Sequence, residues 1–122
     1  MAGKLVHFEI PSGDTARAKE FWGSMFGWEF QSFEGPNEYH MIQGTEPGGG
    51  LHPRQPEQPA GMTVYFDTDD VAAGATKVES LGGSVVTPKM PVPGMGYLAI
   101  CADTEGNTFG LWESDESAEA PS

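Results

Sequence analysis

Near the start of the chain, hydrophobic and polar residues alternate with the two-residue period of a β-strand. The apolar residues Val6, Phe8 and Ile10 share one face, and His7 and Glu9 lie on the other. We expect the apolar face to pack against a helix, which leaves His7 and Glu9 in a different environment.

A helical pattern follows from about residue 15 to residue 25. Its apolar stripe has spacings of three, four and seven residues and consists of Ala18, Phe21, Trp22 and Met25. Either Ser12 or Asp14 supplies the oxygen that caps the first turn, and Gly27 suits the helix end. The aromatic side chains of the stripe are expected to serve packing.

The same order of patterns returns in the second half at an offset of 56 residues. A strand pattern begins at Thr63, and Asp69 or Asp70 caps a helix over about 71–81. Three short strand patterns follow each helix, near 28–33, 39–43 and 49–52 in the first half and near 84–88, 97–102 and 108–113 in the second. This duplication predicts an α+β fold built from two βαβββ units.

Turn residues set the boundaries between these elements. Residues 34–37 and 103–107 read as turns that precede the next strand, and the Pro/Gly segment 90–96 reads as a loop forming a lid or rim. Three prolines in the segment 53–61 indicate an extended connector.

The chain is expected to form one domain, because two independent cores would each be too small to be stable. The domain covers residues 1–113, with the first unit at about 4–52, the connector at 53–61 and the second unit at about 62–113. The acidic segment 114–122 reads as a disordered tail.

Composition narrows the classes of function. The chain has 6 basic and 18 acidic residues and a formal net charge of −12, which disfavours binding to nucleic acid or to anionic lipid. The acidic charge fits either simple solubility or the attraction of a cationic ligand. No apolar run approaches the roughly 18 residues of a membrane span, and the N-terminus lacks the layout of a secretion signal. The single cysteine, Cys101, excludes an internal disulfide, so we expect a cytoplasmic protein.

Several motifs occur in an order that resembles one family. They are VHFEIPSGD, KEFWGSMFGW, TDDVAA, LGGSVV and the ending DTEGNTFGLWE. Together they resemble the vicinal oxygen chelate superfamily, which includes glyoxalases, extradiol dioxygenases and bleomycin-resistance proteins. The resemblance covers about residues 4–113, and Thr104 stands where the family's last motif usually has proline.

The resemblance implies that the sheets of the two units curve around a shared cavity. Metal-dependent members place four ligands on the cavity face, one each from the first, fourth, fifth and eighth strands. In this sequence those positions fall on His7, Gly50, Thr63 and Gly110. One imidazole cannot hold a divalent ion when such sites need three or four ligands. We therefore expect no metal site and no cofactor.

The candidate site has two parts. His7 could act as a general base oriented by Glu9, or it could be an ordinary strand histidine. His52 shares the cavity face of its strand with Gly50 and completes a set with His7 and Glu9 from which a metal site could be rebuilt, although the spacing does not demand one. His40 is assigned a structural or surface role.

The remaining candidates are predicted to bind ligand rather than to react. Gly50 and Gly110 would open space for a ligand or merely relieve crowding. Thr63 is a poor metal ligand on the same face. Tyr65 and Trp112 could contact a ring of the ligand, and Trp112 could equally belong to a core or a dimer interface.

Three hypotheses for function follow from the resemblance and the charge. The first is a metal-independent glyoxalase-like protein that binds a small organic molecule in the cavity between its two units. The second is a resistance-type protein that sequesters a cationic drug. The third is an enzyme that uses His7, either a glyoxalase-like lyase or isomerase or a hydroxylase-like oxygenase, so the sequence leaves open whether the protein is an enzyme. The family also implies a homodimer. No phosphate-binding loop, nucleophile elbow or zinc-finger pattern occurs in the sequence.

Overall fold

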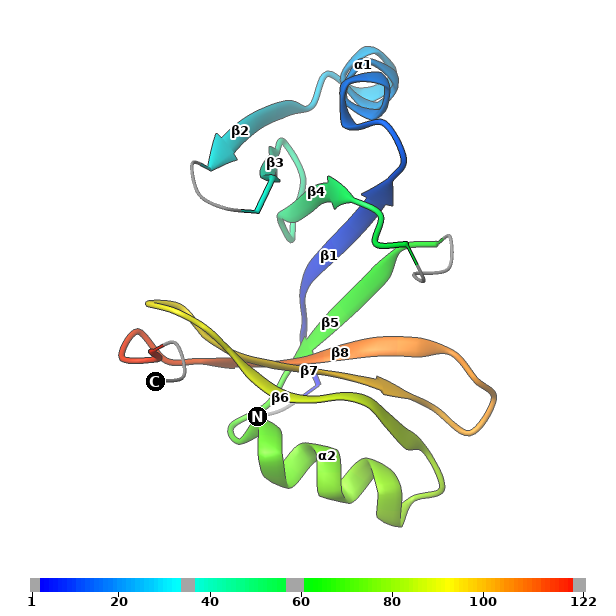
Figure 1. The fold of residues 1–122 in the computed structure, drawn as a ribbon, viewed down its shortest axis with the longest axis vertical. Helices are drawn as coiled ribbons and strands as arrows, with labels where there is room; N and C mark the ends of the chain where they lie inside the picture. The colour runs from blue at the N-terminus through cyan, green and yellow to red at the C-terminus, as the bar shows by residue number, and fades with distance from the viewer. Residues whose placement is uncertain (1–2, 34–36, 57–60, 120–122) are drawn as a thin grey trace. The chain divides into compact units, whose positions relative to one another are not determined.

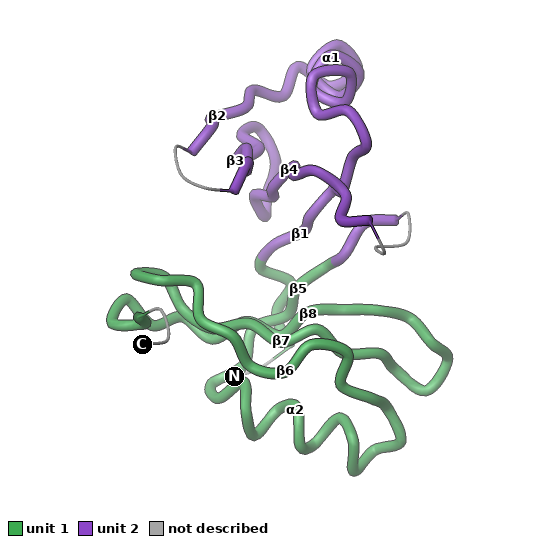
Figure 2. Tube along the Cα trace, in the orientation of Figure 1, with its two compact units in different colours: residues 1–6, 64–122 green, residues 7–63 purple. Residues whose placement is uncertain are grey.

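The computed structural model describes residues 3–33, 37–56 and 61–119, which form two compact units. Unit 2 comprises residues 7–63, and unit 1 comprises residues 1–6 together with 64–122 (Figure 2). Each unit contains a helix and strands in the βαβββ order, as Figure 1 shows. The α+β class and the duplicated unit predicted from the sequence are confirmed. Among the described residues, no helix is both long and apolar enough to cross a membrane.

Unit 2 follows the predicted order with small shifts at the ends of its elements. Its elements are β1 (Leu5–Ser12), α1 (Thr15–Phe26), β2 (Glu29–Phe33), β3 (Tyr39–Gln43) and β4 (Gly49–Pro53). The strands lie in the order β2-β3-β4-β1. Neighbouring strands are antiparallel except for β4, which runs parallel to β1. Most of the turn predicted at 34–37 lies outside the described residues.

The ends of α1 are fixed by two local signals in the sequence. The side chain of Asp14, rather than that of Ser12, accepts a hydrogen bond from the backbone N–H of Arg17 at 3.0 Å. Gly27 ends the helix with φ 73°, in the left-handed region that glycine adopts readily.

The core of unit 2 lies between α1 and one face of the strands. Its buried residues are Ile10, Ile42 and Leu51, with Phe8, Ala18, Trp22, Trp28 and Phe30 packed against them. Trp22 stacks on Trp28 with ring centroids 5.2 Å apart. Phe21 and Met25 of the predicted stripe are exposed, so only Ala18 and Trp22 of the stripe pack against the core.

Unit 1 repeats the arrangement of unit 2. Its elements are β5 (Thr63–Asp67), α2 (Val71–Ser80), β6 (Ser84–Val92), β7 (Gly96–Ala102) and β8 (Thr108–Ser114). The strand order is β5-β8-β7-β6, with β8 parallel to β5. Asp70 caps α2, and Figure 1 shows this helix along one face of the strands. The buried residues between them are Val71, Ala99 and Cys101.

Strand β6 is longer than the sequence predicts. The sequence pattern predicts that the strand ends near residue 88 and that residues 90–96 form a loop, whereas β6 continues to Val92. Two register shifts interrupt its pairing with β7. Because β6 is the edge strand of unit 1, Pro88 and Pro91 can be accommodated at the edge or at irregular positions without costing central hydrogen bonds.

Residues 3 and 4 and the segment 115–118 both pack against other parts of unit 1. The backbone of Gly3 and Lys4 pairs with Asp67. In the acidic segment predicted to be disordered, Asp115 N–H donates to Met95 O at 2.9 Å and Gly94 N–H donates to Ala118 O at 2.8 Å. Ala118 is buried, so this part of the predicted tail contacts the turn at residues 94–95. Residues 120–122 and most of the predicted connector, 57–60, lie outside the described residues.

The thiol of Cys101 is expected to be unreactive in the folded protein. Cys101 is fully buried, and burial, followed by the charge of Glu79, raises the pKa of the thiol. Because the thiolate is the reactive form, we expect the native protein to react with Ellman's reagent only after denaturation in urea. Rapid stoichiometric labelling of the native chain would contradict the buried position.

Candidate functional site

The site residues predicted from the sequence fall into two groups, one in each unit. Unit 2 holds His7, Glu9, Gly50, His52 and Thr63, and unit 1 holds Tyr65, Gly110 and Trp112. Thr63 is the first residue of β5 and is partly buried.

In unit 2 the parallel pairing of β1 and β4 brings four of these residues to one face. Glu9 is the register partner of Gly50. Phe8 and Ile10 face the core, as does Leu51 in β4. Because successive side chains of a strand point to opposite faces, His7, Glu9, Gly50 and His52 share the other face.

Tyr39, which the sequence analysis missed, joins this group. Its hydroxyl lies 2.8 Å from His7 Nε2 and donates to Glu9 Oε2 at 3.0 Å. The direct distance from His7 Nε2 to Glu9 Oε2 is longer, at 3.5 Å. The predicted pairing of His7 with Glu9 therefore runs through the phenol of Tyr39.

The direction of these hydrogen bonds follows from their partners. Since the Tyr39 hydroxyl donates to the carboxylate of Glu9, its oxygen accepts the N–H of His7 Nε2. Imidazole, phenol and carboxylate thus form one chain of hydrogen bonds, and such a chain can donate or accept a proton at a bound molecule.

Tyr39 also fills the space beside Gly50. A Cβ atom at Gly50 would lie 1.9 Å from the Tyr39 hydroxyl oxygen and 2.2 Å from Cζ. The glycine therefore makes room for the tyrosine of this chain, which is the relief of crowding that the sequence analysis gave as the alternative to open space for a ligand. The contact is diagonal across the strand pair, so it could be found only once the register of β3 and β4 was known. The partner of Gly50 is Met41.

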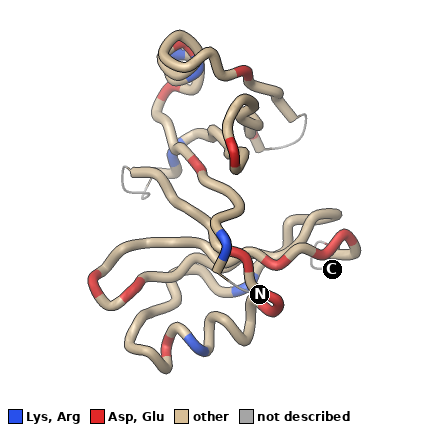
Figure 3. Tube along the Cα trace, turned by 180° about the vertical axis from the view of Figure 1, so that it is seen from behind, with Lys and Arg blue, Asp and Glu red and all other residues tan. Residues whose placement is uncertain are grey.

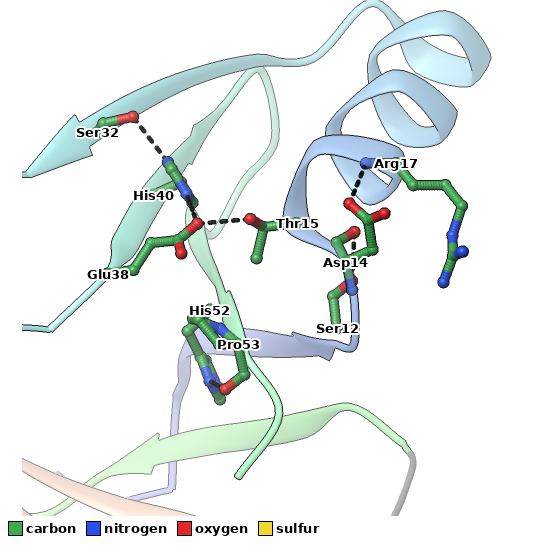
Figure 4. Close-up of polar contacts among 9 residues, drawn as sticks. All are labelled: Ser12, Asp14, Thr15, Arg17, Ser32, Glu38, His40, His52 and Pro53. Atoms are coloured by element: carbon green, nitrogen blue, oxygen red, sulfur yellow. Dashed lines mark hydrogen bonds and ion pairs between the residues drawn. The ribbon is translucent and has the colours of Figure 1, made fainter.

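His52 completes the group. Its ring lies parallel to that of Tyr39, with centroids 6.3 Å apart. Nδ1 is 2.9 Å from the carbonyl oxygen of Pro53, a contact drawn in Figure 4. Because a carbonyl only accepts, Nδ1 carries the hydrogen. Nε2 then faces Glu9 Oε1 at 3.8 Å, and in the neutral imidazole this nitrogen holds a lone pair.

A cavity of about 380 Å³ opens beside these residues. The side chains that line it belong to unit 2 and are Glu9, Asn37, Glu38, Tyr39, His52, Pro53 and Gln55. Two of the seven are carboxylates and none is Lys or Arg. Over the whole chain, Figure 3 shows acidic residues distributed on both units, so the acidic lining is part of a wider excess of negative charge.

The three candidates of unit 1 lie on β5 and β8. Tyr65 is 5% exposed and is the register partner of Gly110. A Cβ atom at Gly110 would lie 2.1 Å from Tyr65 Cδ2, so a tyrosine covers the glycine in this unit as well. Trp112 is half-buried and donates from Nε1 to Ser114 Oγ at 3.1 Å.

The side chains do not fit the metal site that the family resemblance implies. Of the four positions, only His7 carries a strong ligand, and Tyr39 occupies the space in front of Gly50. Within residues 3–33, 37–56 and 61–119, no group of three or more His, Cys, Asp or Glu side chains is arranged to hold a metal ion.

Comparison with known families agrees with the fold described above. Residues 4–111 match the model of the Glyoxalase/Bleomycin resistance protein/Dioxygenase superfamily. The chain belongs to this superfamily. The match spans both βαβββ units up to the middle of β8 and includes every residue of the candidate site except Trp112.

Relatives of this superfamily member include two with contrasting lengths. This chain is 31% identical over 134 residues to "Anthracycline biosynthesis protein DnrV" of Streptomyces peucetius, with 90% of this chain and 46% of the relative covered. It is 30% identical over 118 residues to a "Glyoxylase-like domain-containing protein" of Didymella fabae, with 89% and 92% covered. The chain thus spans about half the length of the Streptomyces relative.

Solved structures of low sequence identity share the fold of this superfamily member. A hypothetical protein from Bacillus halodurans has a TM-score of 0.71 at 18% identity, with 96% of this chain and 98% of that chain covered. Methylmalonyl-CoA epimerase from Mycobacterium tuberculosis has a TM-score of 0.68 at 16% identity, with 92% and 88% covered.

Proposed function

We propose that this chain binds a small organic molecule with its own side chains, in the cavity of unit 2, and does not use a divalent metal ion. The position of the Tyr39 hydroxyl carries the proposal. The Tyr39 hydroxyl lies close to the position that a Cβ atom at Gly50 would take, and it is hydrogen-bonded to His7 and Glu9. These polar groups beside a cavity of about 380 Å³ match the size and the few convergent polar groups of small-ligand sites.

The metal-independent part of the proposal is tested by metal content and thermal stability. We expect the purified protein to contain no stoichiometric divalent metal. Its melting temperature should be the same in excess EDTA as with added Zn²⁺, Mg²⁺ or Mn²⁺, since an ion that bound the native state would raise it. One tightly held ion per chain, removed only with a fall in melting temperature, would refute the proposal.

A second candidate function is the capture of a cationic drug, and the chemistry of the cavity favours it. Glu9 and Glu38 line the cavity. His52 Nε2 and Glu9 Oε1, 3.8 Å apart, are both acceptors when the imidazole is neutral. An ammonium group placed beside them would donate to both and would balance the carboxylate charge.

The name of the Streptomyces relative suggests a compound for the test. That relative is called an anthracycline biosynthesis protein, and the anthracycline doxorubicin joins a flat ring system to a protonated amine. By calorimetry in excess EDTA we expect saturable binding of doxorubicin. Its N-acetylated form should bind about tenfold more weakly, or about 1.4 kcal/mol, because its nitrogen carries no charge. Added salt should weaken the binding of the amine.

Matched variants locate the binding. Glu9→Gln should weaken doxorubicin binding about tenfold, since it removes one of the two carboxylate charges of the cavity and keeps the side-chain shape. Glu29→Gln is the control, because Glu29 is exposed on β2 and does not line the cavity. Equal affinity for doxorubicin and its N-acetylated form, or no binding of either compound, would reject the cationic-drug candidate.

A further inference from the structure

A second polar cluster lies on the opposite face of the unit 2 strands from Tyr39. His40 follows Tyr39 in β3, so the two side chains point to opposite faces. His40 is 5% exposed and is the cross-strand partner of Ser32 in β2. The cavity proposal uses neither residue, although Glu38, which completes the cluster, also lines the cavity.

The cluster connects four side chains in a row, as Figure 4 shows. Ser32 Oγ lies 2.7 Å from His40 Nδ1, and His40 Nε2 lies 2.7 Å from Glu38 Oε2. The same carboxylate oxygen accepts the hydroxyl of Thr15, in the first turn of α1, at 2.5 Å. Both ring nitrogens of a buried imidazole are thus engaged, one with a hydroxyl and the other with a carboxylate.

The protonation order of this row can be derived from its partners. Hydrogen bonds from Thr15 and then from His40 lower the pKa of the Glu38 carboxyl, so near neutral pH it is an ionised group that only accepts. Nε2 of His40 therefore carries the hydrogen. In the neutral imidazole, Nδ1 then holds a lone pair and accepts the hydroxyl hydrogen of Ser32.

This is the order in which a nucleophile, a base and an orienting carboxylate are arranged in serine-dependent acyl transfer. We propose that Ser32 is a nucleophile activated by His40, that Glu38 is the positioning residue for His40, and that Ser32 accepts the acyl group of activated aryl esters. The accessibility of Ser32 and of His40 suits these roles. Ser32 is exposed on β2, the edge strand of unit 2, whereas the imidazole behind it is shielded from water.

The reaction has two balanced steps. Ser32 Oγ forms a bond to the ester carbonyl carbon while its proton moves to His40 Nδ1, and the bond from that carbon to the aryl oxygen breaks. The departing phenolate takes the proton back from His40, which leaves a neutral phenol and an acyl group on Ser32. Water then attacks the acyl group with His40 again as the base, and this releases a carboxylic acid and restores Ser32.

The test uses diisopropyl fluorophosphate on the full chain, because Ser32 would displace fluoride from phosphorus and keep a stable adduct. Ser24 of α1 is the internal control, since it is an exposed serine whose hydroxyl contacts the carboxylate of Glu20 at 3.4 Å rather than an imidazole. Peptide mass spectrometry should show Ser32 labelled at least about 100-fold faster than Ser24, the low end of general-base catalysis.

Three variants test the assigned roles. Ser32→Ala should remove the adduct and the release of p-nitrophenol from p-nitrophenyl acetate, whereas Ser24→Ala should leave both unchanged. Glu38→Gln should slow labelling of Ser32 about tenfold or more while the circular dichroism spectrum stays native. If Glu38 only stabilised the fold, the substitution would not slow labelling without changing the spectrum. Labelling of Ser32 no faster than that of Ser24, or labelling unaffected by Glu38→Gln, would overturn the proposal.

Discussion

Gly110→Ala is expected to lower the free energy of unfolding by about 3 kcal/mol, the upper end of the usual cost of overpacking a core. The new Cβ atom would lie 2.1 Å from Cδ2 and 2.8 Å from Cγ of Tyr65. Both atoms are close to the point where the ring joins its strand, so a small rotation cannot move them away. Tyr65 is only 5% exposed, and its neighbours restrict larger movements. Urea denaturation followed by circular dichroism measures the change.

The control for this variant is Gly13→Ala. A Cβ atom added at Gly13 would have no atom beyond its chain neighbours within 4 Å. The φ of Gly13 also lies outside the left-handed region. Alanine there should be neutral or should stabilise by up to about 1 kcal/mol, because it restricts the unfolded chain. Similar losses of stability in both variants would show that the contact with Tyr65 is not the cause.

Gly50→Ala is expected to lower the free energy of unfolding by about 2 kcal/mol, and the loss should depend on Tyr39. The new methyl group would displace the tyrosine ring, since its carbon would lie 2.2 Å from Cζ. Displacement would also break the hydrogen bonds of the hydroxyl with His7 and Glu9. The same variant should therefore weaken binding in the cavity of unit 2.

A double-mutant cycle separates the ring from its hydroxyl. In a Tyr39→Ala background, Gly50→Ala should cost little, which gives a coupling energy of about 2 kcal/mol between the two positions. In a Tyr39→Phe background most of the cost should remain, because the ring carbon at the clash is retained. Additive effects in the Tyr39→Ala background would mean that Tyr39 does not occupy the space beside Gly50.

Local signals were sufficient to place most of the elements. The change from a two-residue to a helical period located α1 to within one residue, and β3 was placed at its observed bounds. Asp14 and Asp70 were each one of two residues suggested as caps. These features depend on neighbours in sequence, which is why they can be read without a structure.

The rest depended on which strands become neighbours. Pro88 looks like the end of a strand until β6 is known to be an edge strand. Tyr39 looks like an ordinary strand residue until the register places Met41 opposite Gly50. The same holds for Ser32, because its contact with His40 needs the pairing of β2 with β3. Periodicity gives the face on which a side chain lies but not the side chain that it meets.

The pairing of Lys4 with Asp67 has a consequence for synthesis on the ribosome. The N–H of Lys4 donates to Asp67 Oδ1 at 2.8 Å across a separation of 63 residues. At about 5–20 residues per second, Lys4 is synthesised roughly 3–13 s before its partner Asp67. The contiguous segment 7–63 is synthesised in that interval and can fold first. Completion of unit 1 is therefore a late event in translation, and a chain that stalled before Asp67 would carry its first residues unpaired.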